Sequence, residues 1–151
     1  MKKTIATIAI TAITTVVIAA ACFAGCAKKS VKQTASAYLD QEDNTITATV
    51  DLTDGYSCDF ARGAVYLQDE KGNEVAMGLT LGQDVYEEYA AAAKADATSK
   101  EIAGGVMYQG DGEMVFVKTV GDSAYFGIFA QNATPAQMEK LVERITVAPE
   151  F

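Results

Sequence analysis

Alternating apolar and polar residues, interrupted by turn sequences, fill most of the chain after residue 44. The first such run is Thr45–Leu52, in which every second residue is apolar: Ile46, Ala48, Val50 and Leu52. This alternation predicts a strand with one buried face. Asp54-Gly55 follows as a turn signal, so we expect residues 56–60 to return as a hairpin partner. Strands joined by such short turns pair antiparallel, and this restricts the possible folds more than any other feature of the sequence.

The same pattern predicts further strands. Residues 65–67 resume the alternation of 56–60 after a bulge or close approach at Gly63. A turn at Glu70–Asn73 leads to a returning strand over residues 75–79. Downstream we expect a three-strand meander and a short edge strand, over residues 106–108, 114–120, 124–130 and 145–147.

Two helix starts separate these strands. Asp84-Val85-Tyr86-Glu87 fits a capping box and predicts a helix to about Ala97. Thr134-Pro135-Ala136-Gln137 fits a second capping box, with proline at the first helical position. The second helix carries an apolar stripe at helical spacing, formed by Met138, Leu141, Val142 and Ile145. The order β-β-β-α-β-β-β-α-β predicts an α+β fold, with an antiparallel sheet of about six to seven strands and two helices packed on it.

The passage from Ala124–Phe129 through the Thr134-Pro135 helix to the final short strand loosely resembles the PsbP-like fold. That fold occurs in photosynthetic extrinsic proteins and in some bacterial lipoproteins. The resemblance covers about a quarter of the chain and rests on the order of elements. It implies a fold and assigns a function to no residue.

The N-terminus has the features of a secretory signal, because Met1-Lys2-Lys3 is basic and no charge occurs from Thr4 to Ala27. The run contains Phe23-Ala24-Gly25-Cys26, which resembles the bacterial lipobox, with Phe23 where the lipobox prefers Leu. The resemblance implies cleavage between Gly25 and Cys26 by the lipoprotein signal peptidase. It also implies a diacylglycerol thioether on Cys26 and a further acyl chain, such as palmitate, on the new amino group. Cys22 fits the pattern less well.

These features predict a signal peptide over residues 1–25, a flexible tether over 26–37 and a single acidic domain over 38–151. The alternative is an uncut N-terminal helix, because an uncharged run of this length could span a hydrocarbon core of about 30 Å. In both cases Lys2 and Lys3 hold the short end inside the cell. We therefore expect an extracytoplasmic protein, lipid-anchored to the bacterial cell membrane through Cys26.

Charged residues are distributed unevenly along the chain. All 20 acidic residues lie at or after Asp40, together with only seven of the 12 basic residues, so this part carries a net charge of −13. Nucleic-acid binding requires a basic surface, and we therefore expect no nucleic acid among the partners.

The residue types exclude most catalytic sites. The chain contains no histidine, which removes Ser-His and Cys-His pairs and histidine-bearing zinc sites. Acid–base catalysis needs two carboxylates in different environments within a cleft. The acidic groups of this chain instead fall in expected turns or on exposed faces: Asp40/Glu42/Asp43, Asp69/Glu70, Glu87/Glu88 and Asp111/Glu113. Cys58, the only cysteine after Cys26, is better explained as a core residue than as a nucleophile. We expect no enzyme, no catalytic residue and no cofactor.

Two functions remain open. The first is a non-enzymatic binding or interaction module that engages another protein of the cell envelope through a strand edge or an aromatic face. The alternative is a protein that binds a small ligand or a cation between the sheet and the Asp84 helix. For calcium, Asp111 and Glu113, joined by Asp122 from a neighbouring loop, would supply the oxygen ligands.

Overall fold

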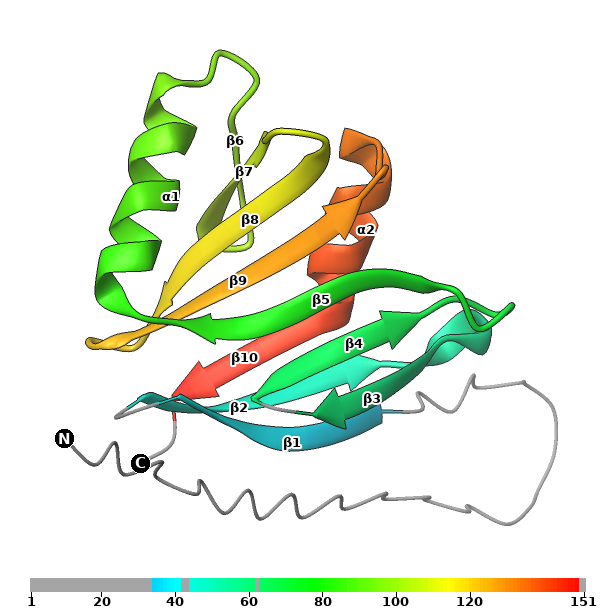
Figure 1. Cartoon of the computed structure of the whole chain (residues 1–151). Coiled ribbons are helices and arrows are strands. Elements are labelled where there is room, and N and C mark those ends of the chain that lie inside the picture. Colours follow the sequence, from blue (N-terminus) through cyan, green and yellow to red (C-terminus); the bar gives the residue numbers. More distant parts are fainter. Residues whose placement is uncertain (1–33, 42–43, 62, 150–151) are drawn as a thin grey trace, which may run out of the picture.

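The computed structural model of the protein describes residues 34–41, 44–61 and 63–149. The strands of this part form two antiparallel sheets (Figure 1). In chain order the elements are β1 (Thr34–Gln41), β2 (Asn44–Asp51), β3 (Ser57–Ala61), β4 (Ala64–Gln68), β5 (Glu74–Leu81), α1 (Gln83–Ala95), β6 (Lys100–Ile102), β7 (Gly105–Gln109), β8 (Glu113–Val120), β9 (Ala124–Gln131), α2 (Pro135–Arg144) and β10 (Ile145–Pro149). One sheet has the order β3-β4-β5-β9-β8-β7-β6, and the other has the order β1-β2-β10. Both helices contact the seven-stranded sheet, so the expected α+β class is confirmed.

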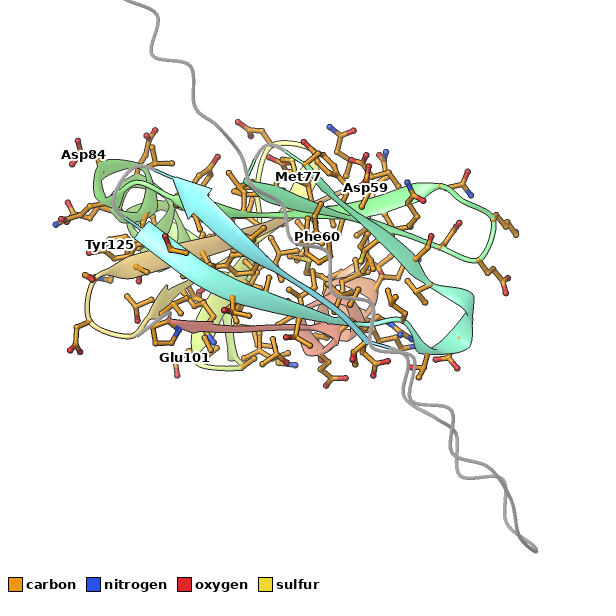
Figure 2. The ribbon with its side chains drawn as sticks, turned by 90° about the horizontal axis from the view of Figure 1, so that it is seen from below. Asp59, Phe60, Met77, Asp84, Glu101 and Tyr125 are labelled. Carbon is orange, nitrogen blue, oxygen red and sulfur yellow. The ribbon has the colours of Figure 1, made fainter. Side chains whose placement is uncertain are left out.

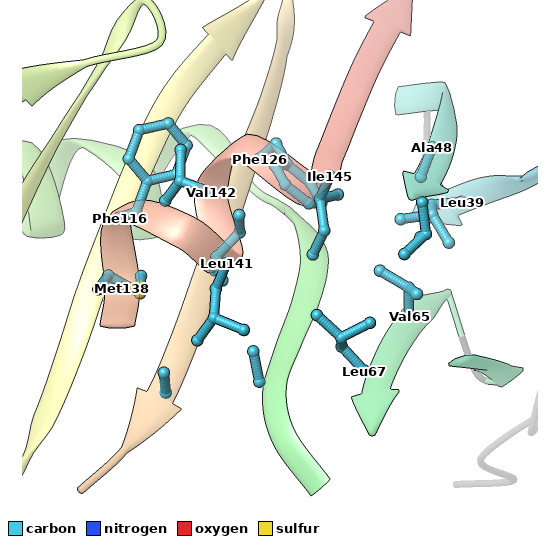
Figure 3. Packing of buried hydrophobic residues seen from close by; sticks show 14 of the residues in the cluster. Leu39, Ala48, Val65, Leu67, Phe116, Phe126, Met138, Leu141, Val142 and Ile145 are labelled. Atoms are coloured by element: carbon cyan, nitrogen blue, oxygen red, sulfur yellow. The ribbon is translucent and has the colours of Figure 1, made fainter. Parts of the chain in front are cut away.

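One face of the seven-stranded sheet, the inner face, is covered by the three-stranded sheet and by α2. The two sheets and α2 share one hydrophobic cluster, in which Figure 3 shows Leu39 and Ala48 near Val65, and Met138, Leu141 and Val142 near Phe116. The inner face is tightly filled at Gly78, where an added Cβ would lie 2.7 Å from the ring of Phe126. Since real Cβ atoms do not approach so closely, β5 needs glycine at this position.

The opposite face, the outer face, is covered by α1 over β7, β8 and β9. The helix stands over this end of the sheet in Figure 1, away from β3 and β4. Two aromatic contacts fix it there. Tyr86 stacks on Tyr125 with ring centres 4.5 Å apart, and Tyr89 meets Phe129 at 5.2 Å. Such ring pairs add about 0.5–1.5 kcal/mol to the effect of burial alone. A helix of 13 residues therefore covers only part of a seven-stranded face.

The predicted hairpin between residues 45–52 and 56–60 is wrong. β2 pairs with β1 and with β10 in the small sheet, whereas β3 pairs with β4 in the large one. A short 3-10 turn over Thr53–Gly55 joins β2 to β3. The expected turn at Asp54-Gly55 is present, but it carries the chain from one sheet to the other.

Arg144, at the end of α2, holds this crossover in place. One of its guanidinium nitrogens donates to the carbonyl oxygens of Asp51 at 3.2 Å and Thr53 at 2.9 Å. The other nitrogen donates to Oδ2 of Asp54 at 2.8 Å. The guanidinium group also lies 3.9 Å from the ring centre of Tyr56. The Arg144 side chain is 16% exposed and that of Asp54 is 77% exposed, so the shielded backbone bonds and the ring contact stabilise the crossover more than the exposed ion pair does.

Three strand boundaries differ from the expected ones. β3 and β4 form a hairpin that reverses at Gly63, which has a φ of +72°, whereas the sequence analysis expected one bulged strand. β1 begins at Thr34 and pairs along its whole length with β2, so residues 34–37, assigned to the tether, belong to a strand. The three residues of β6 were not expected. Each of these segments is too short or too rich in small residues to show a clear alternation.

The two predicted helix starts have different outcomes. The capping box of α2 is confirmed, because Thr134 accepts from the Gln137 N–H at 3.3 Å and Gln137 Oε1 accepts from the Thr134 N–H at 2.8 Å. Asp84 does not cap α1, which begins at Gln83 with Gly82 at the N-cap. Because β5 pairs with β9 as far as Leu81, the chain turns at Gly82 and the helix starts before Asp84.

A pair of methionine variants tests the unequal cover of the two faces. We expect Met138→Ala to lower the free energy of unfolding by about 2–5 kcal/mol, because Met138 is fully buried and its truncation leaves a cavity between α2 and the sheet. Met77→Ala, on the outer face beyond α1, should cost clearly less, because Met77 is already partly exposed to water. Chemical denaturation of both variants measures the difference. Equal losses would contradict the assignment of Met77 to an incompletely covered surface.

Candidate functional site

The predicted lipidation and cleavage residues, Cys26 and Gly25, lie outside the described residues, as do the whole predicted signal peptide and the tether before Thr34. Their roles remain predictions. In the part of the chain that the structure describes, no helix is long and apolar enough to cross a membrane.

Cys58 points to the inner side of β3 and packs at the margin of the main hydrophobic cluster. Burial raises the pKa of its thiol from 9.0 to about 11, and the nearby charge of Asp59 adds to this shift. Because the thiolate is the reactive form, a thiol with this pKa is a poor nucleophile at neutral pH. The interpretation of Cys58 as a packing residue agrees with this environment.

The carboxylates considered as calcium ligands do not converge. Asp111 and Glu113 lie at the start of β8, and Asp122 follows its end, so the eight residues of the strand separate them. Among the described residues, no group of three or more acidic, histidine or cysteine side chains could hold a metal ion.

Two other acidic residues bond within their own turns. Oδ1 of Asp69 accepts from the backbone N–H groups of Lys71 and Asn73, each at 2.9 Å. Bonds from the Asn73 side chain and backbone are the main causes that lower the pKa of Asp69. Asp96 accepts from the hydroxyl and the backbone N–H of Thr98, both at 2.6 Å, and these bonds lower its pKa as well. Both carboxylates therefore stabilise chain reversals.

A wide groove of about 510 Å³ lies between Tyr86 of α1 and the β6–β7 hairpin. Its charged lining residues are Glu101 and Lys118, and Lys118 Nζ already donates to the carbonyl oxygen of Ala103 at 3.2 Å. The groove offers one aromatic ring and the backbone of a hairpin. It does not bring together several polar side chains that could orient a ligand.

A more distinctive surface lies on the outer face beyond α1, over β3, β4 and β5. We call this surface the open face and define it by Asp59, Tyr66, Met77 and Leu79. Asp59 is opposite Tyr66, and Tyr66 is opposite Met77, so these three side chains form one row across the sheet. Tyr66, Met77 and Leu79 are only partly buried. In Figure 2 Met77 and Asp59 lie on the side of the sheet that carries α1, at a distance from the helix.

A small notch opens beside Met77, where β5 and β9 part. Their pairing ends at Met77 opposite Phe129, but β8 and β9 continue as far as Glu113 opposite Gln131. β5 continues beside β4 to Glu74, with a register shift on the way. The notch left between the two hairpins has a volume of about 160 Å³ and is lined by Glu74, Val75, Ala76, Met77, Glu113, Phe129 and Gln131.

The open face was not predicted from the sequence, although β5 carries a signal for it. From Val75 to Leu81 the strand is apolar or small on both faces except at Thr80. The alternation of Val75, Met77 and Leu79 is easily taken for the buried face. In the structure Met77 and Leu79 lie on the outer face, whereas Val75 packs against the inner cluster, because the bulge near Val75 interrupts the alternation.

Comparisons with protein-family models, with curated proteins and with solved structures give no match for this chain. The resemblances to lipoprotein signals and to the PsbP-like fold therefore stay predictions from the sequence.

The environment of Cys58 predicts low reactivity. In a chain with Cys22 and Cys26 replaced by Ser, we expect native Cys58 to react with iodoacetamide near neutral pH about 100-fold more slowly than in the unfolded chain, because the raised pKa reduces the thiolate fraction. The same shift means that its contribution to stability is present below pH 9 and is lost as the pH rises toward about 11. Mass spectrometry of timed reactions measures the rates. A native rate equal to the unfolded one would contradict the packing interpretation and reopen a nucleophilic role.

Proposed function

We propose that this protein is an extracytoplasmic lipoprotein, anchored through Cys26, whose domain is a non-enzymatic binding module for another protein of the cell envelope. The open face is its binding surface. The observation that carries the proposal is the unequal cover of the seven-stranded sheet. Its outer face is covered over β7–β9 by α1, whereas the large apolar side chains over β4 and β5 are only partly buried.

The open face has two properties of a protein-binding surface. Its apolar side chains are adjacent, because Tyr66 and Met77 face each other across β4 and β5, and adjacent exposed apolar groups mark interaction sites more often than scattered ones do. It also ends at β3, which is the last strand of its sheet. A free edge can add a strand from a partner, while the neighbouring side chains give specificity.

A second function, binding of a small ligand, is supported by the groove at Tyr86. Its volume of about 510 Å³ falls within the range of about 300–1,000 Å³ usual for ligand sites. It ranks second because Lys118 is bonded within the hairpin region and few other polar groups line it. The two functions differ in location, since the groove and the open face involve different strands.

The anchor can be tested with two cysteine variants. We expect Cys26→Ser to abolish incorporation of labelled palmitate and to stop cleavage, because the thiol at position +1 carries the lipid. Cys22→Ser is the matched control and should leave labelling and processing unchanged. Metabolic labelling and membrane fractionation of the full chain give the result. Loss of labelling in the Cys22 variant, or labelling that survives in the Cys26 variant, would reject Cys26 as the lipidation site.

The binding surface can be tested by photo-crosslinking of the full chain in the intact cell envelope. A photoreactive phenylalanine in place of Tyr66 should give a discrete, reproducible protein adduct. The same residue in place of Lys140, which is exposed on α2, is the control and should give none. Failure to form an adduct at Tyr66, or equal adducts at both positions, would reject the open face as the binding surface.

A further inference from the structure

We infer that the partner is basic at the point of contact, and that one of its lysine or arginine side chains enters the notch beside Met77, between Glu74 and Glu113. This inference rests on the proposed function and specifies the chemistry of the partner.

The shape follows from the strand pairing. β5 remains paired with β4 as far as Glu74, which lies opposite Gln68. β9 remains paired with β8 as far as Gln131, which lies opposite Glu113. Between these two hairpins the sheet is interrupted beyond Met77 and Phe129. Residues that lie in register on one face share its direction, so Met77, Phe129, Gln131 and Glu113 all belong to the outer face. The notch is therefore continuous with the open face at Met77.

The volume of the notch limits the size of the group that can bind in it. At about 160 Å³ it is smaller than the sites that enclose whole cofactors or drug-sized ligands, which measure about 300–1,000 Å³. It is several times larger than the roughly 30 Å³ that one water molecule occupies in the liquid. A single side chain projecting from a partner fits this size.

The residues that line the notch indicate which type of side chain it favours. Met77 and Phe129 supply apolar walls, whereas Glu74, Glu113 and Gln131 supply acceptor oxygens. Lysine and arginine combine an aliphatic stem with a charged end, so they can contact both parts of this lining at once. Calcium is a poorer match, because it takes about 6–8 oxygen ligands, and only two carboxylates line the notch.

The two carboxylates are available for such a contact. Neither Glu74 nor Glu113 forms an ion pair with the described residues. Three basic residues elsewhere have partners of their own, since Lys100 pairs with Glu139, Lys118 with the carbonyl of Ala103, and Arg144 with Asp54. Lys71, the basic residue nearest to Glu74 in the chain, acts on the turn carboxylate of Asp69. The net charge of −13 from residue 40 onward also attracts a basic partner over a longer range and disfavours an acidic one.

The test uses the methyl signals of Met77 and Met138 in the full-length, lipidated protein in detergent micelles. The probes are an acetylated and amidated Val-Arg-Val peptide and the same peptide with citrulline, which has the shape of arginine without its charge. We expect the arginine peptide to shift the Met77 signal in a saturable manner and to leave the buried Met138 signal unchanged. The citrulline peptide should bind at least about tenfold more weakly than the arginine peptide, as expected for loss of a charged contact.

Matched charge variants locate the contact. Glu74→Gln combined with Glu113→Gln should weaken binding of the arginine peptide by about tenfold. Asp122→Asn combined with Glu143→Gln removes the same number of charges at two exposed sites and should have little effect. The inference is rejected if Met77 does not respond, if both peptides bind equally, or if both double variants weaken binding equally.

The crosslinking experiment separates this inference from the proposed function. An adduct at position 66 that persists in the Glu74→Gln/Glu113→Gln variant would retain the open face as the binding surface and reject the basic contact. Absence of any adduct at position 66 in the unchanged background would reject the proposed function itself. Loss of the adduct in the Glu74→Gln/Glu113→Gln variant, with retention in the Asp122→Asn/Glu143→Gln variant, is the result that we expect.

Discussion

A sheet with apolar side chains on both faces has to be covered on both faces, and the structure of this domain depends on how that requirement is met. The inner face receives a second sheet and α2, which together with it form one continuous cluster of buried residues. The outer face receives one helix of 13 residues, and a separate, smaller cluster forms beneath it. The surface left over at the β3–β5 side is the direct consequence of covering seven strands with one short helix.

To cover the inner face, the chain has to pass from the small sheet to the large sheet and then return to the small one. β2 and β10 are neighbours in the small sheet although they are far apart in sequence. The chain passes to the large sheet after Asp51 and returns through α2 at Ile145. Arg144 lies where the chain returns to the small sheet, and its bonds to Asp51 and Thr53 reach the segment where the chain leaves that sheet. One side chain thus stabilises the junction at which both passages meet.

Much of the local structure could be predicted from the sequence. The α2 capping box, the strands β8 and β9 and the α+β class depend on short-range patterns, and all are confirmed. The division into two sheets could not be predicted, because alternation shows that a strand has a buried face but does not show which other strand lies against it. For the same reason β2 and β3 were expected to pair, although Asp54-Gly55 joins them across two layers.

The candidate site was less predictable than the fold. Single charged residues such as Glu74 and Glu113 are unremarkable in an acidic sequence, and they become neighbours only because β5 and β9 separate beyond Met77. The register shift near Val75, which places Val75 on the opposite face from Met77 and Leu79, has no clear mark in the sequence. The resemblance of Phe23-Ala24-Gly25-Cys26 to the lipobox, in contrast, depends on four consecutive residues and on no tertiary contact, and it remains a prediction.

The position of β1 determines how the domain responds to mechanical force. Under the proposed anchor at Cys26, a pull on the chain would reach the described part of the domain at Thr34, the first residue of β1. β1 is an edge strand, and its eight residues are all paired with β2 in antiparallel register. A pull along the axis of this strand would load the hydrogen bonds between β1 and β2 together, in shear. A pull across the strand would break them one after another. If the proposed anchor holds, the pairing of β1 with β2 would resist tension along the axis of β1 better than tension across it.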